Sequence, residues 1–113
     1  MELESLSDVR VLLVVRKGSP TQILRTVFKI AGLTKVTGVD EPRRAVELLC
    51  TENFHAVFFE GALEHDGMPF ALAVRQLPGI LNPMIAIFAV FPGARKRDVE
   101  AARDLATGKY PEV

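Results

Sequence analysis

Glu60 is the residue that the sequence places best for a role in chemistry. It directly follows the apolar run at 55–59 and opens a loop, so its carboxylate should project from the end of a strand. Arg16 and Lys17 follow another apolar run, at 9–15, and place two cations at a comparable strand end. Since a guanidinium or ammonium group forms charge-assisted hydrogen bonds with a carboxylate, we hypothesise that Arg16 or Lys17 pairs with Glu60. The alternative is that these are ordinary solvated surface residues.

The histidines and the cysteine offer little further chemistry. An imidazole beside carboxylates can transfer protons, and His65 lies between Glu64 and Asp66, but no serine or cysteine nucleophile accompanies it or His55. Cys50 lies in an apolar helical pattern and is expected to be a plain core thiol. Three adjacent loop residues rarely converge on one ion. We therefore expect no catalytic residue, no metal site and no cofactor.

The order of predicted elements positions these residues. Short aliphatic and β-branched runs alternate with segments whose apolar residues recur at helical spacing, which predicts an α/β protein with a parallel sheet. Right-handed crossovers then favour a doubly wound, three-layer sandwich, with ligands at the carboxyl ends of the strands. Strands are predicted at 9–15, 34–39, 55–59, 84–90 and 109–113, and helices at about 20–31, 40–49, 69–77 and 95–105.

Two predicted helices carry start signals. Ser19 before Pro20 fits an N-cap followed by proline at the first helical position, and Asp40 before Pro42 fits the same pattern. The loop after Glu60 is predicted to run from 61 to 67. The buried stripe of the first helix is predicted to comprise Ile23, Leu24, Val27, Phe28 and Ala31.

Length and charge limit the classes of function. The chain has 113 residues, enough for one domain, and its 14 basic residues balance 14 acidic ones. Such a chain has no overall field to hold nucleic acid or an anionic membrane, and its basic runs at 43–44 and 95–97 are expected to be solvated. No apolar run is long enough to cross a bilayer, and residues 1–4 lack a signal-peptide pattern, so we expect a cytoplasmic protein.

The whole chain resembles the receiver domain of bacterial two-component response regulators, the chemotaxis-regulator-like fold. The segments that carry the resemblance are 11–14 with the turn and helix that follow, 54–60, Asp66-Gly67, 83–87 and 99–104. The resemblance implies a flavodoxin-like sheet with strand order 2-1-3-4-5. It also implies a domain in which a strand-three aspartate accepts a phosphoryl group from a histidine kinase, with Mg²⁺ held beside it.

The family's phosphorylation residues are replaced here. The acceptor aspartate aligns with Glu60, which is one methylene longer, and the acid pair after strand one aligns with Val15 and Arg16. The strand-four hydroxyl falls near Phe88 or Ala89, neither of which has one. With Lys17, these positions are expected to surround the crevice, and a fixed cation there should replace the metal.

The end of the chain also departs from the family. The strand-five lysine would fall near Val113, and Tyr110 is the candidate for the family's switch aromatic. The last helix is expected to be missing, which would uncover one sheet flank beside the first helix and favour a homodimer or a partner segment that fills the gap.

Three functions remain open at this point. The first is a degenerate receiver-like signalling module that acts by protein–protein contact with a kinase or a downstream regulator, without phosphorylation and without enzymatic activity. The second is a phosphorelay receiver that still accepts a phosphoryl group at an unusual site. The third is a small flavodoxin-like protein that binds an anion or a nucleotide at the turn 16–20, where cations precede a helix N-terminus.

Overall fold

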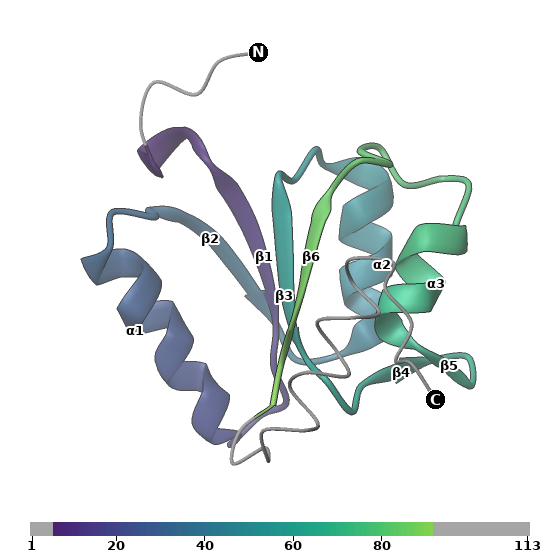
Figure 1. Cartoon of the computed structure of the whole chain (residues 1–113), viewed down its shortest axis with the longest axis horizontal. Helices are drawn as coiled ribbons and strands as arrows, with labels where there is room; N and C mark the ends of the chain where they lie inside the picture. The colour runs from purple at the N-terminus through teal and green to yellow at the C-terminus, as the bar shows by residue number, and fades with distance from the viewer. Residues whose placement is uncertain (1–5, 92–113) are drawn as a thin grey trace, which may run out of the picture.

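A four-stranded parallel sheet forms the centre of the molecule. The computed structural model describes residues 6–91, which begin with a short 3-10 helix, η1 (Leu6–Asp8). All pairings in the sheet are parallel, and the strand order is β2-β1-β3-β6 (Figure 1). The strands are β1 (Arg10–Val14), β2 (Lys35–Val39), β3 (Ala56–Glu60) and β6 (Ala86–Val90).

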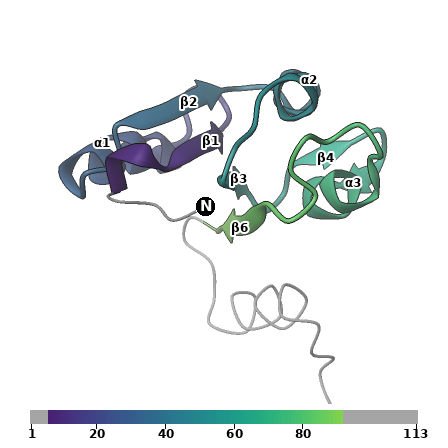
Figure 2. The ribbon, with the colours of Figure 1, turned by 90° about the horizontal axis from the view of Figure 1, so that it is seen from above.

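Helices cover both faces of this sheet. The 3-10 turn η2 (Pro20–Gln22) leads into α1 (Ile23–Ile30), which lies on one face, against β1 and β2. The helices α2 (Pro42–Thr51) and α3 (Phe70–Gln76) lie on the opposite face (Figures 1 and 2). Within residues 6–91, no helix has the length and apolar character required to cross a membrane.

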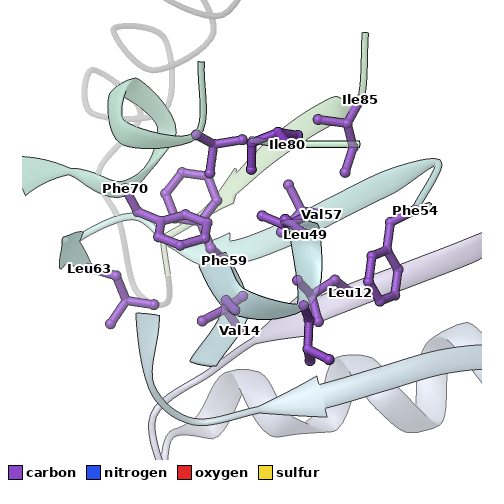
Figure 3. Packing of buried hydrophobic residues seen from close by; sticks show 13 residues of the cluster. Leu12, Val14, Leu49, Phe54, Val57, Phe59, Leu63, Phe70, Ile80 and Ile85 are labelled. Carbon is purple, nitrogen blue, oxygen red and sulfur yellow. The ribbon is translucent and has the colours of Figure 1, made fainter. Parts of the chain in front are cut away.

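Strand alternation divides the core into two parts. Even-numbered residues of β1, Leu12 and Val14, face α2 and α3 together with Val57 and Phe59 of β3 (Figure 3). The odd-numbered residues of β1 lie in the smaller cluster on the α1 face with Phe28. Because successive side chains of a strand point to opposite faces, both faces of β1 are apolar, as expected of a strand buried between two helical layers.

The predicted class, α/β with a parallel sheet, is confirmed, but the strand order differs from the expected 2-1-3-4-5. The described sheet has four strands, in the order β2-β1-β3-β6. Its outer strand beside β3 is the sixth strand along the chain, because the two hairpin strands β4 and β5 lie between β3 and β6 in the sequence. The predicted helix at 95–105 and the predicted strand at 109–113 lie outside the described residues.

The hairpin replaces most of the loop that the sequence predicted at 61–67. It pairs β4 (Glu64–His65) with β5 (Met68–Pro69) in antiparallel fashion. Its two turn residues, Asp66 and Gly67, have φ angles of 50° and 81°. A two-residue turn with positive φ at both positions favours Asp-Gly, so this dipeptide was a usable hairpin signal.

The start signals of the two helices had different outcomes. Ser19 is confirmed as a cap, because its hydroxyl oxygen accepts a hydrogen bond from the Thr21 N–H at 3.2 Å. Asp40 is not the cap of α2. Glu41 holds that position without a side-chain hydrogen bond, because Pro42 is already the first helical residue and the cap must directly precede it.

The buried stripe of α1 is narrower than predicted. Phe28 is buried and Leu24 is partly buried, but Ile23, Val27 and the neighbouring Ile30 are exposed. The helix meets the sheet through Leu24 and Phe28, and within residues 6–91 the flank that carries the other apolar residues remains exposed.

Candidate functional site

The carboxylate of Glu60 closes the gap between the ends of β1 and β3. In a parallel sheet, successive residues of a strand hydrogen-bond alternately to one neighbouring strand and the other. The Val15 N–H donates to the Val39 carbonyl of β2 at 3.0 Å, so the next amide, that of Arg16, points toward β3. There it donates to Oε1 of Glu60. The side chain of Glu60 therefore supplies the acceptor that the ended strand no longer provides.

This contact corrects the hypothesis of a side-chain ion pair. Residue 16 does meet Glu60, but through its main-chain N–H; within residues 6–91, no ion pair joins Glu60 to the Arg16 guanidinium or to Lys17. The physical reason is that Arg16 and Lys17 are exposed and keep their hydration, whereas an amide between two strands needs an acceptor.

A second side chain performs the same task at the opposite end of this strand pair. Nδ1 of His55 accepts a hydrogen bond from the Arg10 N–H at 2.9 Å, and the His55 N–H donates to the Arg10 carbonyl at 2.9 Å. The residue before β3 and the last residue of β3 thus both cap amides of β1 or its continuation. Sequence reasoning missed this role of His55; its place directly before a buried strand was the only available signal.

A hollow opens at the carboxyl ends of the strands, where the parallel sheet predicted one. Its volume is ≈ 470 Å³, and it is bordered by one cation and two carboxylates. Asp40 follows β2, and Glu64 belongs to the hairpin after β3. The lining residues are Arg16, Asp40, Pro42, Ala62, Leu63 and Glu64. Of the predicted crevice residues, Arg16 borders this hollow, whereas Val15 is buried on the α1 face.

The predicted neighbours of Glu60 on the fourth strand need correction. Glu60 pairs in register with Val90, and Phe88 and Ala89 pair with Phe58 and Phe59. Phe88 stacks on Phe58 on the α1 face, with ring centroids 4.6 Å apart and an interplanar angle of 16°. The predicted end of this strand, Val90, agrees with the end of β6, but the position that faces Glu60 was placed one to two residues early, at Phe88 or Ala89.

An aromatic ring that the sequence did not single out lies beside the site. A Cβ atom at Gly61 would lie 2.1 Å from Cε1 of Phe91, so only glycine admits this ring. The Gly61 N–H donates to the Val90 carbonyl at 2.8 Å and extends the β3–β6 ladder by one residue. The ring of Phe91 therefore packs directly against the backbone that follows Glu60.

The residues at this site do not fit the Mg²⁺ of the receiver family. That ion takes oxygen ligands, including carboxylates, in octahedral geometry. The positions of the family's acid pair are a buried valine, Val15, and a cation, Arg16, and the Glu60 carboxylate accepts the Arg16 N–H. In residues 6–91, no three His, Cys, Asp or Glu side chains are grouped as metal ligands.

The other candidates of the sequence lie apart from this hollow. Nε2 of His65 is 3.4 Å from Oδ2 of Asp66, its neighbour in the hairpin turn. Cys50 is partly buried against the larger core cluster, in keeping with a structural thiol. Tyr110, the candidate switch aromatic, lies outside the described residues.

The turn after β1, which was a candidate anion site, binds several of its main-chain N–H groups to acceptors within the turn itself. The Ser19 N–H donates to the Arg16 carbonyl at 3.0 Å, and the Gln22 N–H donates to the Ser19 carbonyl at 3.1 Å. The Thr21 N–H is bound by the Ser19 hydroxyl. A phosphate-binding turn needs free N–H groups aimed at the ligand, and these three are already engaged.

Comparison with models of protein families gave no match, and comparison with curated proteins gave none either.

Proposed function

We propose that this protein is a receiver-like signalling module that works by protein–protein contact and without phosphoryl transfer. The proposal is supported by a parallel sheet covered on both faces, with α1 on one side and α2 and α3 on the other. It is also supported by an acidic residue, Glu60, at the carboxyl end of the third strand along the chain.

The single observation that carries the proposal is the contact between Glu60 and the Arg16 amide. A phosphoacceptor carboxylate must present its oxygen to a phosphoryl donor, with a metal ion and further donors neutralising the charge. Here one carboxylate oxygen is held by the main chain between two strands, and Arg16 borders the hollow where the family places acids. This arrangement serves the shape of the crevice rather than group transfer.

Glu60 also places a carboxylate at the carboxyl end of β3. A phosphorylated side chain carries about −1.5 to −2 charges at neutral pH, whereas a glutamate carries one, so Glu60 imitates a phosphorylated acceptor only in part. Output would then follow from partner binding or from the amount of protein, without a kinase-driven switch.

Incubation with acetyl phosphate and Mg²⁺, followed by intact-mass spectrometry, tests the proposal. We expect no mass increase of one phosphoryl group in the wild-type chain, under conditions in which an active receiver is labelled. A phosphoryl group mapped to Glu60, Glu64 or Asp66 would instead establish a phosphorelay receiver with an unusual acceptor. A thermal-shift screen with nucleotides addresses the anion-binding alternative, for which we expect no stabilisation because the Ser19, Thr21 and Gln22 amides are engaged.

A further inference from the structure

The hollow at the carboxyl ends of the strands lies where the chain turns to opposite faces of the sheet. From β1 the chain continues to α1 on one face, and from β3 it continues through the hairpin to α3 on the other (Figure 2). Because β1 and β3 are neighbours, their carboxyl ends border a crevice between two diverging loops. In open α/β sheets such a crevice is the usual place of a ligand, and a volume of ≈ 470 Å³ is in the range of small-molecule sites.

Hydrogen bonds fix the main chain on both sides of this hollow. The Arg16 N–H donates to the Glu60 carboxylate, and the Arg16 carbonyl accepts from the Ser19 N–H at 3.0 Å. On the other side, the Leu63 N–H donates to the Glu60 carbonyl at 3.0 Å, and the Leu63 carbonyl accepts from the Phe70 N–H at 3.0 Å. The Leu63 side chain is buried in the larger core cluster. The walls are therefore in place before a ligand arrives, which lowers the entropic cost of binding.

Three charged side chains border the hollow without a partner in an ion pair. Arg16 follows β1, Asp40 follows β2 and Glu64 belongs to β4. Within residues 6–91, no ion pair engages any of the three, although their charges are opposite. Asp40 also borders a neighbouring hollow that Arg25 and Arg44 line, and no ion pair in the same range joins it to either arginine. One guanidinium and two carboxylates thus remain available to a ligand.

The signs of these charges select the chemistry of the ligand. A guanidinium binds a carboxylate through two parallel hydrogen bonds, whereas carboxylates accept hydrogen bonds from ammonium groups. An inorganic anion would meet two like charges in this hollow, and a simple amine would leave the guanidinium unpaired. The complementary ligand carries one carboxylate and two cationic groups.

We propose that the hollow binds a free amino acid with a basic side chain, such as lysine. The ligand's carboxylate pairs with Arg16, and its two ammonium groups are bound by Asp40 and Glu64. This inference goes beyond the proposed function and does not depend on it, because it concerns a small molecule rather than a protein partner or phosphoryl transfer.

Titration of the ¹⁵N-labelled full chain with free lysine, followed by ¹H–¹⁵N NMR, tests the proposal. We expect saturable shifts of the Arg16, Asp40 and Glu64 amides. Three compounds each lack one charged group: norleucine lacks the side-chain ammonium, Nα-acetyl-lysine the α-ammonium and cadaverine the carboxylate. Each should bind at least about tenfold more weakly than lysine, since each loses one charge-assisted pair. No saturable shift with lysine, or equal affinity for all of these compounds, overturns the proposal.

Variants locate the ligand within the hollow. Arg16→Gln should weaken lysine binding about tenfold and remove the advantage of lysine over cadaverine, because Arg16 contacts the carboxylate. Glu64→Gln should weaken binding of both compounds. Asp66→Asn is the matched control, since Asp66 is a carboxylate of the same hairpin that does not line the hollow, and asparagine tolerates the positive φ of this turn. The NMR spectrum verifies that each variant is folded. Unchanged lysine binding by Arg16→Gln, or equal losses in Glu64→Gln and Asp66→Asn, contradicts the site.

Two further readouts separate this hollow from its neighbour and the two proposals from each other. Asp40→Asn should weaken lysine binding, whereas Arg44→Gln should not, because Arg44 lines only the neighbouring hollow. A loss of lysine affinity in Arg44→Gln would place the ligand in that hollow and overturn the assignment. An unlabelled chain that does not bind lysine removes the ligand site alone, and a phosphoryl-labelled chain that binds lysine removes the proposed function alone.

Discussion

The main-chain N–H of Arg16 donates a hydrogen bond to the carboxylate of Glu60, and this contact links the ends of β1 and β3. Its counterpart at the other end of the strand pair is the bond from the Arg10 N–H to Nδ1 of His55. Glu60 and His55 thus supply acceptors for main-chain amides at the two ends of the β1–β3 pair, and the Glu60 contact lies at the carboxyl ends of the strands, where the hollow opens.

Replacing Glu60 should separate its hydrogen-bonding role from its charge. Glu60→Gln keeps an oxygen acceptor for the Arg16 N–H, so we expect stability close to wild type. Glu60→Ala leaves that amide without its protein acceptor and should cost about 0.5–1.5 kcal/mol, since water can partly replace the bond at this exposed position. Urea unfolding midpoints at unchanged m-value measure both effects. If Glu60→Gln lost as much stability as Glu60→Ala, charge rather than the hydrogen bond would dominate.

His55 should exist in one tautomer. Because Nδ1 accepts the Arg10 N–H, the neutral ring must carry its proton on Nε2, which long-range ¹H–¹⁵N NMR detects. His55→Asn retains an acceptor at a similar position, and His55→Ala removes it, so the alanine variant should be less stable by about 1 kcal/mol. An Nδ1–H tautomer would show that this bond does not form in solution.

Gly61 and Phe91 should be energetically coupled. The Cβ atom of Gly61→Ala would meet the Phe91 ring at 2.1 Å, so the ring must move, at a cost of about 1–3 kcal/mol. In the Phe91→Ala background the same substitution meets no ring and should cost much less. A double-mutant cycle from urea unfolding measures this coupling, and additive effects would contradict the contact.

Two phenylalanines should differ sharply in their contribution to stability. Phe70 is 0% exposed and packs with Phe59 at a centroid distance of 5.1 Å, so Phe70→Ala should cost about 3–5 kcal/mol. Phe88 is partly exposed and stacks on one ring, that of Phe58. Phe88→Ala should therefore cost less than half as much stability as Phe70→Ala. Equal losses would mean that Phe88 is covered in the protein in solution.

The exposed ion pair of Arg10 and Glu52, near Phe54, should contribute little to stability despite its short distance. Nη2 of Arg10 lies 2.6 Å from Oε1 of Glu52, and the guanidinium lies 5.3 Å from the centre of the Phe54 ring. Both charged side chains are more than a third exposed, so solvent screens the pair and a double-mutant cycle of Arg10→Met and Glu52→Gln should give about 0.5 kcal/mol. A coupling several times larger would indicate a buried pair.

The sequence alone determined the α/β class and, within residues 6–91, the strands of the parallel sheet and its helices, but not the hairpin β4–β5. Apolar runs such as 9–15 and 55–59 require burial on both faces, and only a parallel sheet between helices supplies it, so the strands, the capping by Ser19 and the place of Glu60 at a strand end were predictable. These properties depend on residues that are neighbours along the chain.

The tertiary structure decided which atoms meet. Whether Glu60 contacts the guanidinium or the amide of Arg16 depends on which way the amide points once β1 and β3 are in register, and the partner of Glu60 on β6 depends on a register that no local pattern specifies. The exposure of Ile23 and Val27 likewise depends on where α1 crosses the sheet. Helical periodicity locates an apolar face, but burial requires a second surface to cover it, and that surface comes from residues distant in the chain.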